Sequence, residues 1–253
     1  MDRFIIEKDN KEKKNMVHIA HPSVTVTATM GLVEQGDTTT MDSLGMDTNR
    51  QVTPNDLNSE FGGRICYDSH HRPNPHTFET TDYLKNIIEQ GHHSVLEHSV
   101  VSVIISGISR TCAQELLRHR HFSPSMVSQR YVNEAKPEVS IVIPPAIEKN
   151  PQLVDKLIQL AQQTEKFYTE TVEELSTEFE RKQAREAARA GLLNCAETKL
   201  QLTGNMRSFR EFIAKRTDPG ADKEIQRLAH LVLEAIYPYS PGCLQDFAHL
   251  LEK

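Results

Sequence analysis

The chain has 253 residues, of which 38% are apolar and 25% charged, and its formal net charge is -6 at pH 7. This composition is typical of a soluble globular protein, and the net negative charge argues against a general affinity for nucleic acid. No apolar run approaches the roughly 18 residues that a membrane span requires, so we expect neither secretion nor a membrane anchor. The four cysteines form no CxxC pair, which excludes a zinc knuckle, speaks against a disulfide scaffold and favours a cytoplasmic protein.

The chain begins with a charged segment that has no hydrophobic periodicity. We predict a flexible N-terminal extension over residues 1–21 and a single domain, catalytic if the chain is an enzyme, over residues 22–253. Valines alternate with threonines in SVTVTATMG, residues 23–31, which predicts a strand. The polar segment over residues 34–58 is typical of a long loop.

Helices and strands alternate through the middle of the chain. Apolar spacing predicts a helix over residues 81–90, ended by Gly91, and VVSVIIS, residues 100–106, predicts a buried strand. Ser109 is a plausible N-cap of a helix that ends near residue 118. That helix places Ala113, Leu116 and Leu117 on one face.

The C-terminal half is mostly helical. VSIVIP, residues 139–144, predicts a strand, and residues 151–190 predict two helices or one broken helix. TKLQLTG, residues 198–204, predicts another strand, and helices are expected over 206–216 and 223–237. The fold class is therefore α+β, and we find no internal repeat.

A basic cluster stands out in RHRHFSPSMVSQRY, residues 118–131, because four consecutive side chains are basic. On a helix, Arg118, His119 and Arg120 would point about 100° apart, so they would reach different parts of one large ligand or different partners. Ser128 offers a hydroxyl, and Arg130 a planar fork suited to a phosphate. The alternative is a solvated helix end whose basic residues complement the dipole.

Two further groups of polar residues have structural alternatives. In GHHSVLEH, residues 91–98, the residues His92, His93, Glu97 and His98 could bind a metal, or could simply cap a helix and satisfy the core. Arginines and amides recur later in the chain, and the first three arginines form a helical stripe that glutamates could pair instead. These residues are Arg181, Arg185, Arg189, Asn205, Arg207, Arg210 and Arg216. No GxGxxG or GxxxxGK[ST] motif is present.

The basic cluster has the form arginine, histidine, arginine, seven residues, serine, and it resembles the signature of the flavin-dependent thymidylate synthases. Three more segments resemble this family in the same order: GHHSVLEHSVVSVIISGISR, RKQAREAARAGLLNCAET and TGNMRSFREFIAKR. Together they cover about residues 62–228. The resemblance implies a central, mainly antiparallel sheet flanked by helices, and a cytoplasmic homotetramer with active sites at subunit interfaces.

The resemblance also implies the reaction and its site. The family methylates dUMP to dTMP with FAD as cofactor, methylenetetrahydrofolate as carbon donor and NADPH as reductant. The catalytic residues it implies are Arg216 and Ser128. The FAD-binding residues it implies are His92, Ser94, Glu97, Arg118, His119, Arg120, Asn205 and Arg207. The dUMP-binding residues it implies are Glu115, Arg118, Ser128, Gln129, Arg130, Arg189 and Arg216; no metal is implied.

The chain departs from the usual family pattern at three places. Ser125 and Met126 stand where many members have asparagine and glutamate, Glu115 stands near a frequent glutamine, and Gly220 stands where many have a histidine. Nothing resembles the proline-cysteine motif of the other thymidylate synthase class, so we expect a methyltransferase without a cysteine nucleophile.

Two other functions stay open at this point. One is a metal-dependent nucleotide phosphohydrolase built from His92, His93, His98, His119 and His121. The other is a non-catalytic nucleotide- or RNA-binding protein that uses the arginine stripe, for which salt-sensitive RNA binding would be diagnostic.

Overall fold

The computed structural model describes residues 17–35, 38–43, 46, 51–69, 74–135 and 138–251. The chain forms two compact units. Unit 1 contains the described part of Met1–His21 together with Gly107–Thr111 and Val127–Thr198. Unit 2 contains Pro22–Ser106, Cys112–Met126 and Lys199–Lys253, again as far as they are described.

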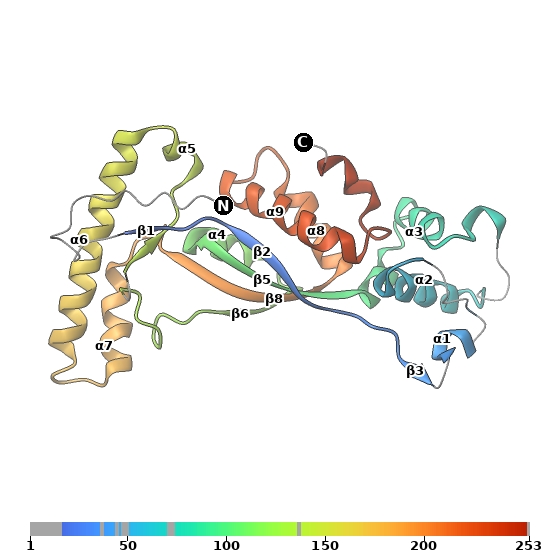
Figure 1. Cartoon of the computed structure of the whole chain (residues 1–253), viewed down its shortest axis with the longest axis horizontal. Coiled ribbons are helices and arrows are strands. Elements are labelled where there is room, and N and C mark those ends of the chain that lie inside the picture. The colour runs from blue at the N-terminus through green and yellow to red at the C-terminus, as the bar shows by residue number, and fades with distance from the viewer. Residues whose placement is uncertain are drawn as a thin grey trace. The chain divides into compact units, whose positions relative to one another are not determined.

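A sheet of four strands has the order β2 (Ser23–Thr29), β5 (Val100–Ser109), β8 (Glu197–Asn205) and β6 (Ser123–Met126), and all of it except residues 107–109 and 197–198 belongs to unit 2. Strand β2 runs antiparallel to β5, with a bulge between Val26 and Ala28, and β6 runs antiparallel to β8. This open antiparallel sheet, with helices beside it (Figure 1), confirms the predicted α+β class.

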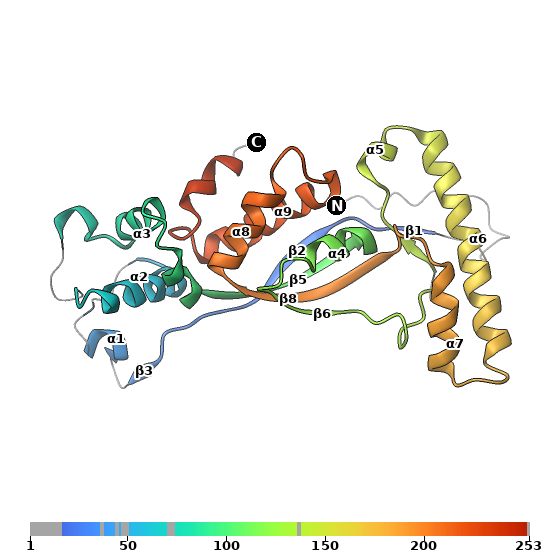
Figure 2. The same cartoon turned by 180° about the vertical axis from the view of Figure 1, so that it is seen from behind.

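Two C-terminal helices cover the sheet of unit 2. Helix α9 (Lys223–Ile236) lies against β2, and α8 (Met206–Arg216) packs beside α9; both views show them on the same side of the sheet (Figures 1 and 2). Leu228, Val232 and Ile236 of α9 are fully buried. The bounds of α8 are those that the sequence predicts, and α3 (Thr80–Glu89) is shifted by one residue from its prediction. Gly91 ends α3 with a φ of 71°, a left-handed conformation that favours glycine.

The prediction of a long loop over residues 34–58 is wrong, because the described part of this range contains strands and helices. Helix α2 (Pro54–Cys66) begins inside that range, and Thr53 caps it by accepting a hydrogen bond of 3.2 Å from the Asp56 amide. Strands β3 (Glu34–Gln35) and β4 (Thr38–Thr39) and helix α1 (Thr40–Ser43) also lie there. Hydrophobic periodicity missed α2 because much of its buried face is polar: Asn55, Asp56, Ser59, Glu60 and Arg64.

Unit 1 contains a helical hairpin. Helix α6 (Pro151–Leu175) and helix α7 (Arg181–Ala188) lie side by side, which confirms two helices within residues 151–190 (Figures 1 and 2). Strand β1 (His18–Ile19) pairs in parallel with β7 (Ser140–Ile141), so the strand predicted over residues 139–144 is shorter than expected. The core of this unit is formed by Val139, Ile141, Ile143 and Ala161. Its short helices are α5 (Pro145–Glu148) and η3 (Arg189–Gly191).

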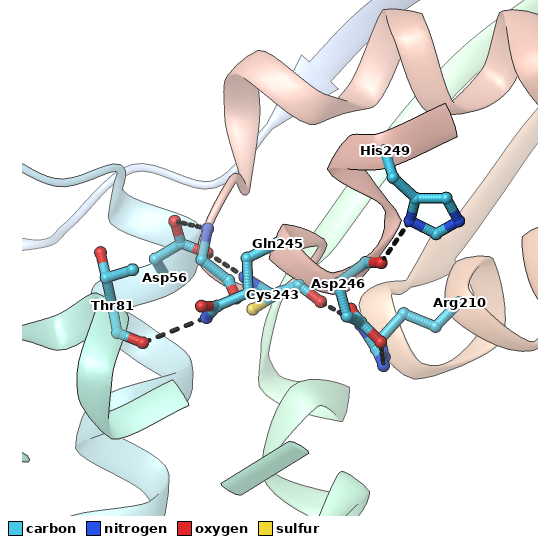
Figure 3. Close-up of polar contacts among 8 residues, drawn as sticks. Asp56, Thr81, Arg210, Cys243, Gln245, Asp246 and His249 are labelled. Atoms are coloured by element: carbon cyan, nitrogen blue, oxygen red, sulfur yellow. Dashed lines mark hydrogen bonds and ion pairs between the residues drawn. The ribbon is translucent and has the colours of Figure 1, made fainter. Parts of the chain in front are cut away.

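The last turns of unit 2 are held by a network that we name the C-terminal clamp: Asp56, Arg210, Ser240, Gly242, Cys243 and Asp246. Figure 3 labels Asp56, Arg210, Cys243 and Asp246 of this network. The buried Asp56 carboxylate accepts hydrogen bonds from the Ser240 hydroxyl and from the Gly242 and Cys243 amides, at 2.8, 2.8 and 3.0 Å. Arg210 donates to the Cys243 carbonyl at 2.6 Å and to both oxygens of Asp246 at 2.5 and 2.7 Å. The clamp therefore ties α2 and α8 to the C-terminal segment that continues into η5 (Gln245–Leu250).

The remaining short helices of unit 2 are η1 (Pro75–Thr77), η2 (His93–His98) and η4 (Tyr237–Tyr239). In the part of the chain that the structure describes, no helix combines the length and the apolar character needed to cross a bilayer.

Candidate active site

The basic triplet Arg118, His119 and Arg120 follows helix α4 (Arg110–Leu116) in unit 2 and lies in a turn. The predicted helix through this region is therefore too long: Ser109 is the last residue of β5, and Leu117 is 37% exposed instead of facing the core. The two arginines of the triplet are exposed. A turn separates the directions of the three side chains, as the sequence analysis expected of a helix.

His119 is the inward-facing member of the triplet. Its half-buried ring packs edge-on against Phe212 of α8, with ring centroids 5.2 Å apart, and lies 6.3 Å from the Phe122 ring. Phe122 in turn packs against Phe209 at 4.9 Å. The position of His119 is thus fixed by an aromatic core that belongs to α8 and the turn after α4.

Arg216, the last residue of α8, meets this turn. Its Nε donates to Nε2 of His119 at 3.0 Å, and its two terminal nitrogens donate to the Glu115 carboxylate at 2.7 Å and the Glu115 carbonyl at 3.2 Å. We name Glu115, His119 and Arg216 the Arg216 cluster. All three residues belong to unit 2, so the structure brings together one residue predicted for FAD and two predicted for dUMP.

The Arg216 cluster affects the protonation of His119. Burial, and next the positive charge of Arg216, lower the pKa of His119 below its ordinary value. A neutral imidazole that accepts a hydrogen bond on Nε2 carries its proton on Nδ1. The cluster therefore contains one arginine cation, one carboxylate and one neutral ring.

The other residues predicted for FAD lie around η2 and the start of α8, also in unit 2. Arg207 forms an ion pair with Glu97, with Arg207 Nη1 and Glu97 Oε1 2.5 Å apart, and both side chains are about half exposed. Asn205 caps α8 by accepting from the Ser208 amide and hydroxyl at 2.9 Å each, so its carboxamide NH2 group is the part that could donate to a ligand. His92 and Ser94 are exposed.

These residues are chemically suited to a flavin dinucleotide. Its pyrophosphate carries negative charge, and the exposed arginines of unit 2 include Arg118, Arg120 and Arg207. Within the described ranges, no side chain forms a hydrogen bond or an ion pair with Arg118 or Arg120. Two cations are thus available for an extended polyanion.

The remaining residues predicted for dUMP lie in unit 1. The Ser128 hydroxyl accepts from the Arg130 amide at 3.3 Å, and Arg130 Nε lies 2.7 Å from Oε2 of Glu186 on α7. Gln129 is half-buried, and Arg189 is exposed at the first residue of η3. The sequence does not reveal the contact of Arg130 with Glu186, because the two residues are distant in sequence.

The metal-binding alternative is not supported. Among the described residues, no group of three or more histidine, cysteine, aspartate or glutamate side chains is arranged to hold a metal ion. His93 and Glu97 lie in a 3-10 helix, where residues three apart are aligned and residues four apart are not. His119 already uses Nε2 as an acceptor for Arg216.

Two of the cysteines are poor nucleophiles. Cys112 and Cys243 are almost completely inaccessible. Burial raises the pKa of Cys112, and burial together with the Asp56 charge raises the pKa of Cys243 to about 12. Both thiols stay protonated at neutral pH, as expected for a protein without thiolate chemistry at these positions.

Comparison with known proteins shows the family of the chain. The Thy1 family, described as thymidylate synthase complementing protein, matches residues 51–242. A flavin-dependent thymidylate synthase of Mycobacterium marinum is 47% identical over 196 residues, which are 74% of this chain and 78% of the relative. Proteins of the same name from Mycobacterium avium and Mycobacterium tuberculosis are each 46% identical over the same shares. The chain therefore belongs to the flavin-dependent thymidylate synthase family.

Proposed function

We propose that this protein converts dUMP to dTMP by reductive methylation, with FAD as cofactor, methylenetetrahydrofolate as carbon donor and NADPH as reductant. Family membership supports the reaction, and the chemistry of the described side chains supports it independently. The observation that carries the proposal is the Arg216 cluster, because it presents a fixed guanidinium beside the basic triplet instead of a cysteine nucleophile.

Arg216 is the residue that we assign to the uracil ring. Methyl transfer to the ring carbon requires negative charge to build up on the ring nitrogen and carbonyl oxygen, and guanidinium N–H groups stabilise such charge. Electrostatic stabilisation of this kind is strongest where the donor is fixed before the substrate arrives. The three hydrogen bonds that Arg216 donates to His119 and Glu115 fix its guanidinium in this way.

The phosphate of dUMP is assigned to Ser128, Gln129, Arg130 and Arg189 of unit 1. The Ser128 hydroxyl and the Arg130 guanidinium are a donor pair suited to a compact dianion. Arg130 approaches Glu186 through Nε, so its terminal nitrogens can serve the phosphate. Ser128 is also proposed as a catalytic residue.

The flavin is assigned to exposed and half-buried residues of unit 2: His92, Ser94, Glu97, Arg118, His119, Arg120, Asn205 and Arg207. Bound FAD would supply the reducing equivalent for the transferred carbon. Arg118 and Arg120 would hold its phosphates, and the Arg207–Glu97 pair and the Asn205 amide would orient its polar edges. We further propose a cytoplasmic homotetramer and a single catalytic domain over residues 22–253.

The test uses the purified full chain reconstituted with FAD. We expect NADPH to bleach the flavin absorption band, and dUMP with methylenetetrahydrofolate labelled in the methylene carbon to restore it while labelled dTMP forms. Omission of dUMP is the control and should give no labelled nucleotide. A protein that neither retains added FAD nor forms dTMP would contradict the proposal, and size-exclusion chromatography with light scattering would decide the tetramer separately.

A further inference from the structure

Arg216 has more donors than its partners use. A guanidinium carries five N–H groups in one plane. One donates to His119 and two donate to Glu115, one to its carboxylate and one to its carbonyl. As far as the described residues go, one N–H on each terminal nitrogen is left for a ligand.

The partners of Arg216 are themselves rigid. The turn that carries them is closed by backbone hydrogen bonds from Arg118 to Glu115 at 3.3 Å and from His119 to Leu116 at 3.1 Å. The His119 ring is held edge-on by Phe212, which lies four residues before Arg216 and one helical turn away on α8. Three hydrogen bonds thus hold the guanidinium to one rigid segment, whose His119 ring is itself held by α8.

Without such partners, Arg216 would be poorly ordered. An arginine side chain has several rotamers of similar energy, and Arg216 stands at the end of α8, where only one neighbouring helical turn can restrict it. Its side chain is nevertheless only 19% exposed, and that of Glu115 is 30% exposed. The partial burial strengthens their mutual attraction compared with an exposed surface pair.

We infer that Glu115 and His119 are positioning residues that hold the Arg216 guanidinium with one N–H of each terminal nitrogen directed to the pyrimidine, and that His119 does so only as the neutral, Nδ1-protonated ring. This inference rests on the proposed role of Arg216 and replaces the expectation that Glu115 binds dUMP and His119 binds FAD directly. Glu115 acts through its acceptor oxygen, and His119 acts through the lone pair on Nε2.

Protonation of His119 would release Arg216. An imidazolium has no acceptor lone pair, so the hydrogen bond from Arg216 Nε would be lost, and two cations would face each other about 3 Å apart. The charged groups that face His119 are Arg216, Lys215 and Glu211 of α8, and Glu115 of the α4 segment holds the opposite side of Arg216. The lowered pKa of His119 means that this release occurs only below its ordinary value of 6.5.

The first experiment is a double-mutant cycle on dUMP binding to the FAD-loaded protein, measured calorimetrically without folate so that no turnover occurs. Glu115→Ala should weaken binding about tenfold to a hundredfold, as expected for a lost hydrogen bond to a charged group. Glu115→Gln keeps an acceptor and should stay within about threefold of the parent protein.

The cycle is completed by Arg216→Ala and by the double variant. If Glu115 acts through Arg216, the double variant should bind dUMP as Arg216→Ala does, because nothing is left to position. If the losses of dUMP affinity in the two single variants multiply in the double variant, Glu115 contacts dUMP itself and the inference is wrong. If Arg216→Ala alone leaves dUMP binding unchanged, the proposed role of Arg216 fails instead.

The second experiment is the pH profile of dUMP binding to the same FAD-loaded protein. Protonation of the dUMP phosphate, with a second pKa of about 6, weakens binding to both proteins, so the difference between their profiles is the measurement. The parent protein should lose more affinity than His119→Gln, which keeps an acceptor but does not titrate, as the pH falls through a value below 6.5. FAD affinity is measured over the same pH range, so that a loss of bound FAD can be distinguished from a loss of dUMP binding. An identical acid limb in His119→Gln would refute the role of the neutral ring, and if that variant does not fold, the Glu115 cycle still decides the inference.

Discussion

Two arginines on α8, only six residues apart, are used in opposite ways. Arg210 is 7% exposed, and both of its terminal nitrogens are bound, by Asp246 and by the Cys243 carbonyl, while its guanidinium lies over the Phe247 ring. Arg216 donates three hydrogen bonds, one to His119 and two to Glu115. As far as the described residues show, it keeps one N–H on each terminal nitrogen. The first arginine stabilises the fold, and the second is the one that we propose binds the pyrimidine.

The difference lies in the partners and not in the arginines. Asp246 matches the planar fork of Arg210 with both of its carboxylate oxygens, which leaves that edge no capacity for a substrate. Glu115 offers Arg216 one carboxylate oxygen and one carbonyl, and His119 offers one nitrogen. Each arginine donates three hydrogen bonds, and Nε of Arg210 has no partner among the described residues, so the number of satisfied donors does not distinguish them. What differs, besides the kind of partner, is burial, because the Arg210 side chain is 8% exposed and the Arg216 side chain 19%.

The largest effect is expected from the C-terminal clamp at Asp56. Asp56→Ala removes the acceptor of two buried backbone amides and one buried hydroxyl, so the free energy of unfolding should fall by about 3–5 kcal/mol. Urea unfolding of the FAD-free protein measures the loss. Asp82→Ala, at an exposed position in the first turn of α3, is the matched control and should change stability by less than about 1 kcal/mol. A similar loss in both variants would remove the special role of the clamp.

Arg216→Ala should mainly affect catalysis. Loss of its stabilising donors should reduce dTMP formation by about 10²–10³-fold, which corresponds to about 2.7–4 kcal/mol. The neighbouring Lys215→Ala is the control, because its exposed pair with Glu211 contributes little and turnover should stay within about threefold. Radiolabelled dTMP formation under saturating FAD measures both. Equal losses in the two variants would argue for a general effect of charge.

Asp246→Ala separates the two arginines. It leaves the buried Arg210 without its carboxylate, so stability should fall by about 1–2 kcal/mol, a discounted value because the Asp246 side chain is 43% exposed. Turnover per folded molecule should not change, because Arg210 binds no substrate. Urea unfolding and dTMP formation are measured on the same preparation. A loss of turnover larger than the loss of folded protein would place Arg210 in the active site.

The smallest effect is expected at Cys243. Cys243→Ala removes a buried sulfur that lies 3.6 Å from the Ser59 hydroxyl, and stability should fall by about 1 kcal/mol. dTMP formation should persist, because the raised pKa of this thiol makes it no nucleophile at neutral pH. Cys112→Ala tests the other buried thiol in the same assay. Complete loss of turnover in a folded variant would contradict a mechanism without cysteine.

The sequence predicted those elements whose buried residues are apolar. The bounds of α8 and the helical character of residues 151–190 follow from helical spacing, and Pro151 marks the start of α6. Helix α2 escaped prediction because its buried face carries Asn55, Asp56 and Ser59, which bond to distant segments. Local periodicity cannot reveal such partners.

The site shows the same limit. The basic triplet and Arg216 could be singled out from residue type and spacing, and the family resemblance ordered them. Sequence could not reveal that His119 and Glu115 bind Arg216, because about a hundred residues separate them and a turn, not a helix, sets their directions. Nor could it separate Arg210 from Arg216, because both are arginines on one amphipathic helix.

The C-terminal clamp also has a consequence for the order of events during synthesis. Asp56 is translated 187 residues before Cys243, its hydrogen-bond partner. The contacts of Asp56 therefore cannot form until residues 240–243 have left the ribosome, whereas the α6–α7 hairpin of unit 1 requires only neighbouring residues. Other polar residues on the buried face of α2 find partners earlier, as Asn55 does at Thr29 and Ser59 at Ser99, so the Asp56 carboxylate is the group that waits for most of translation.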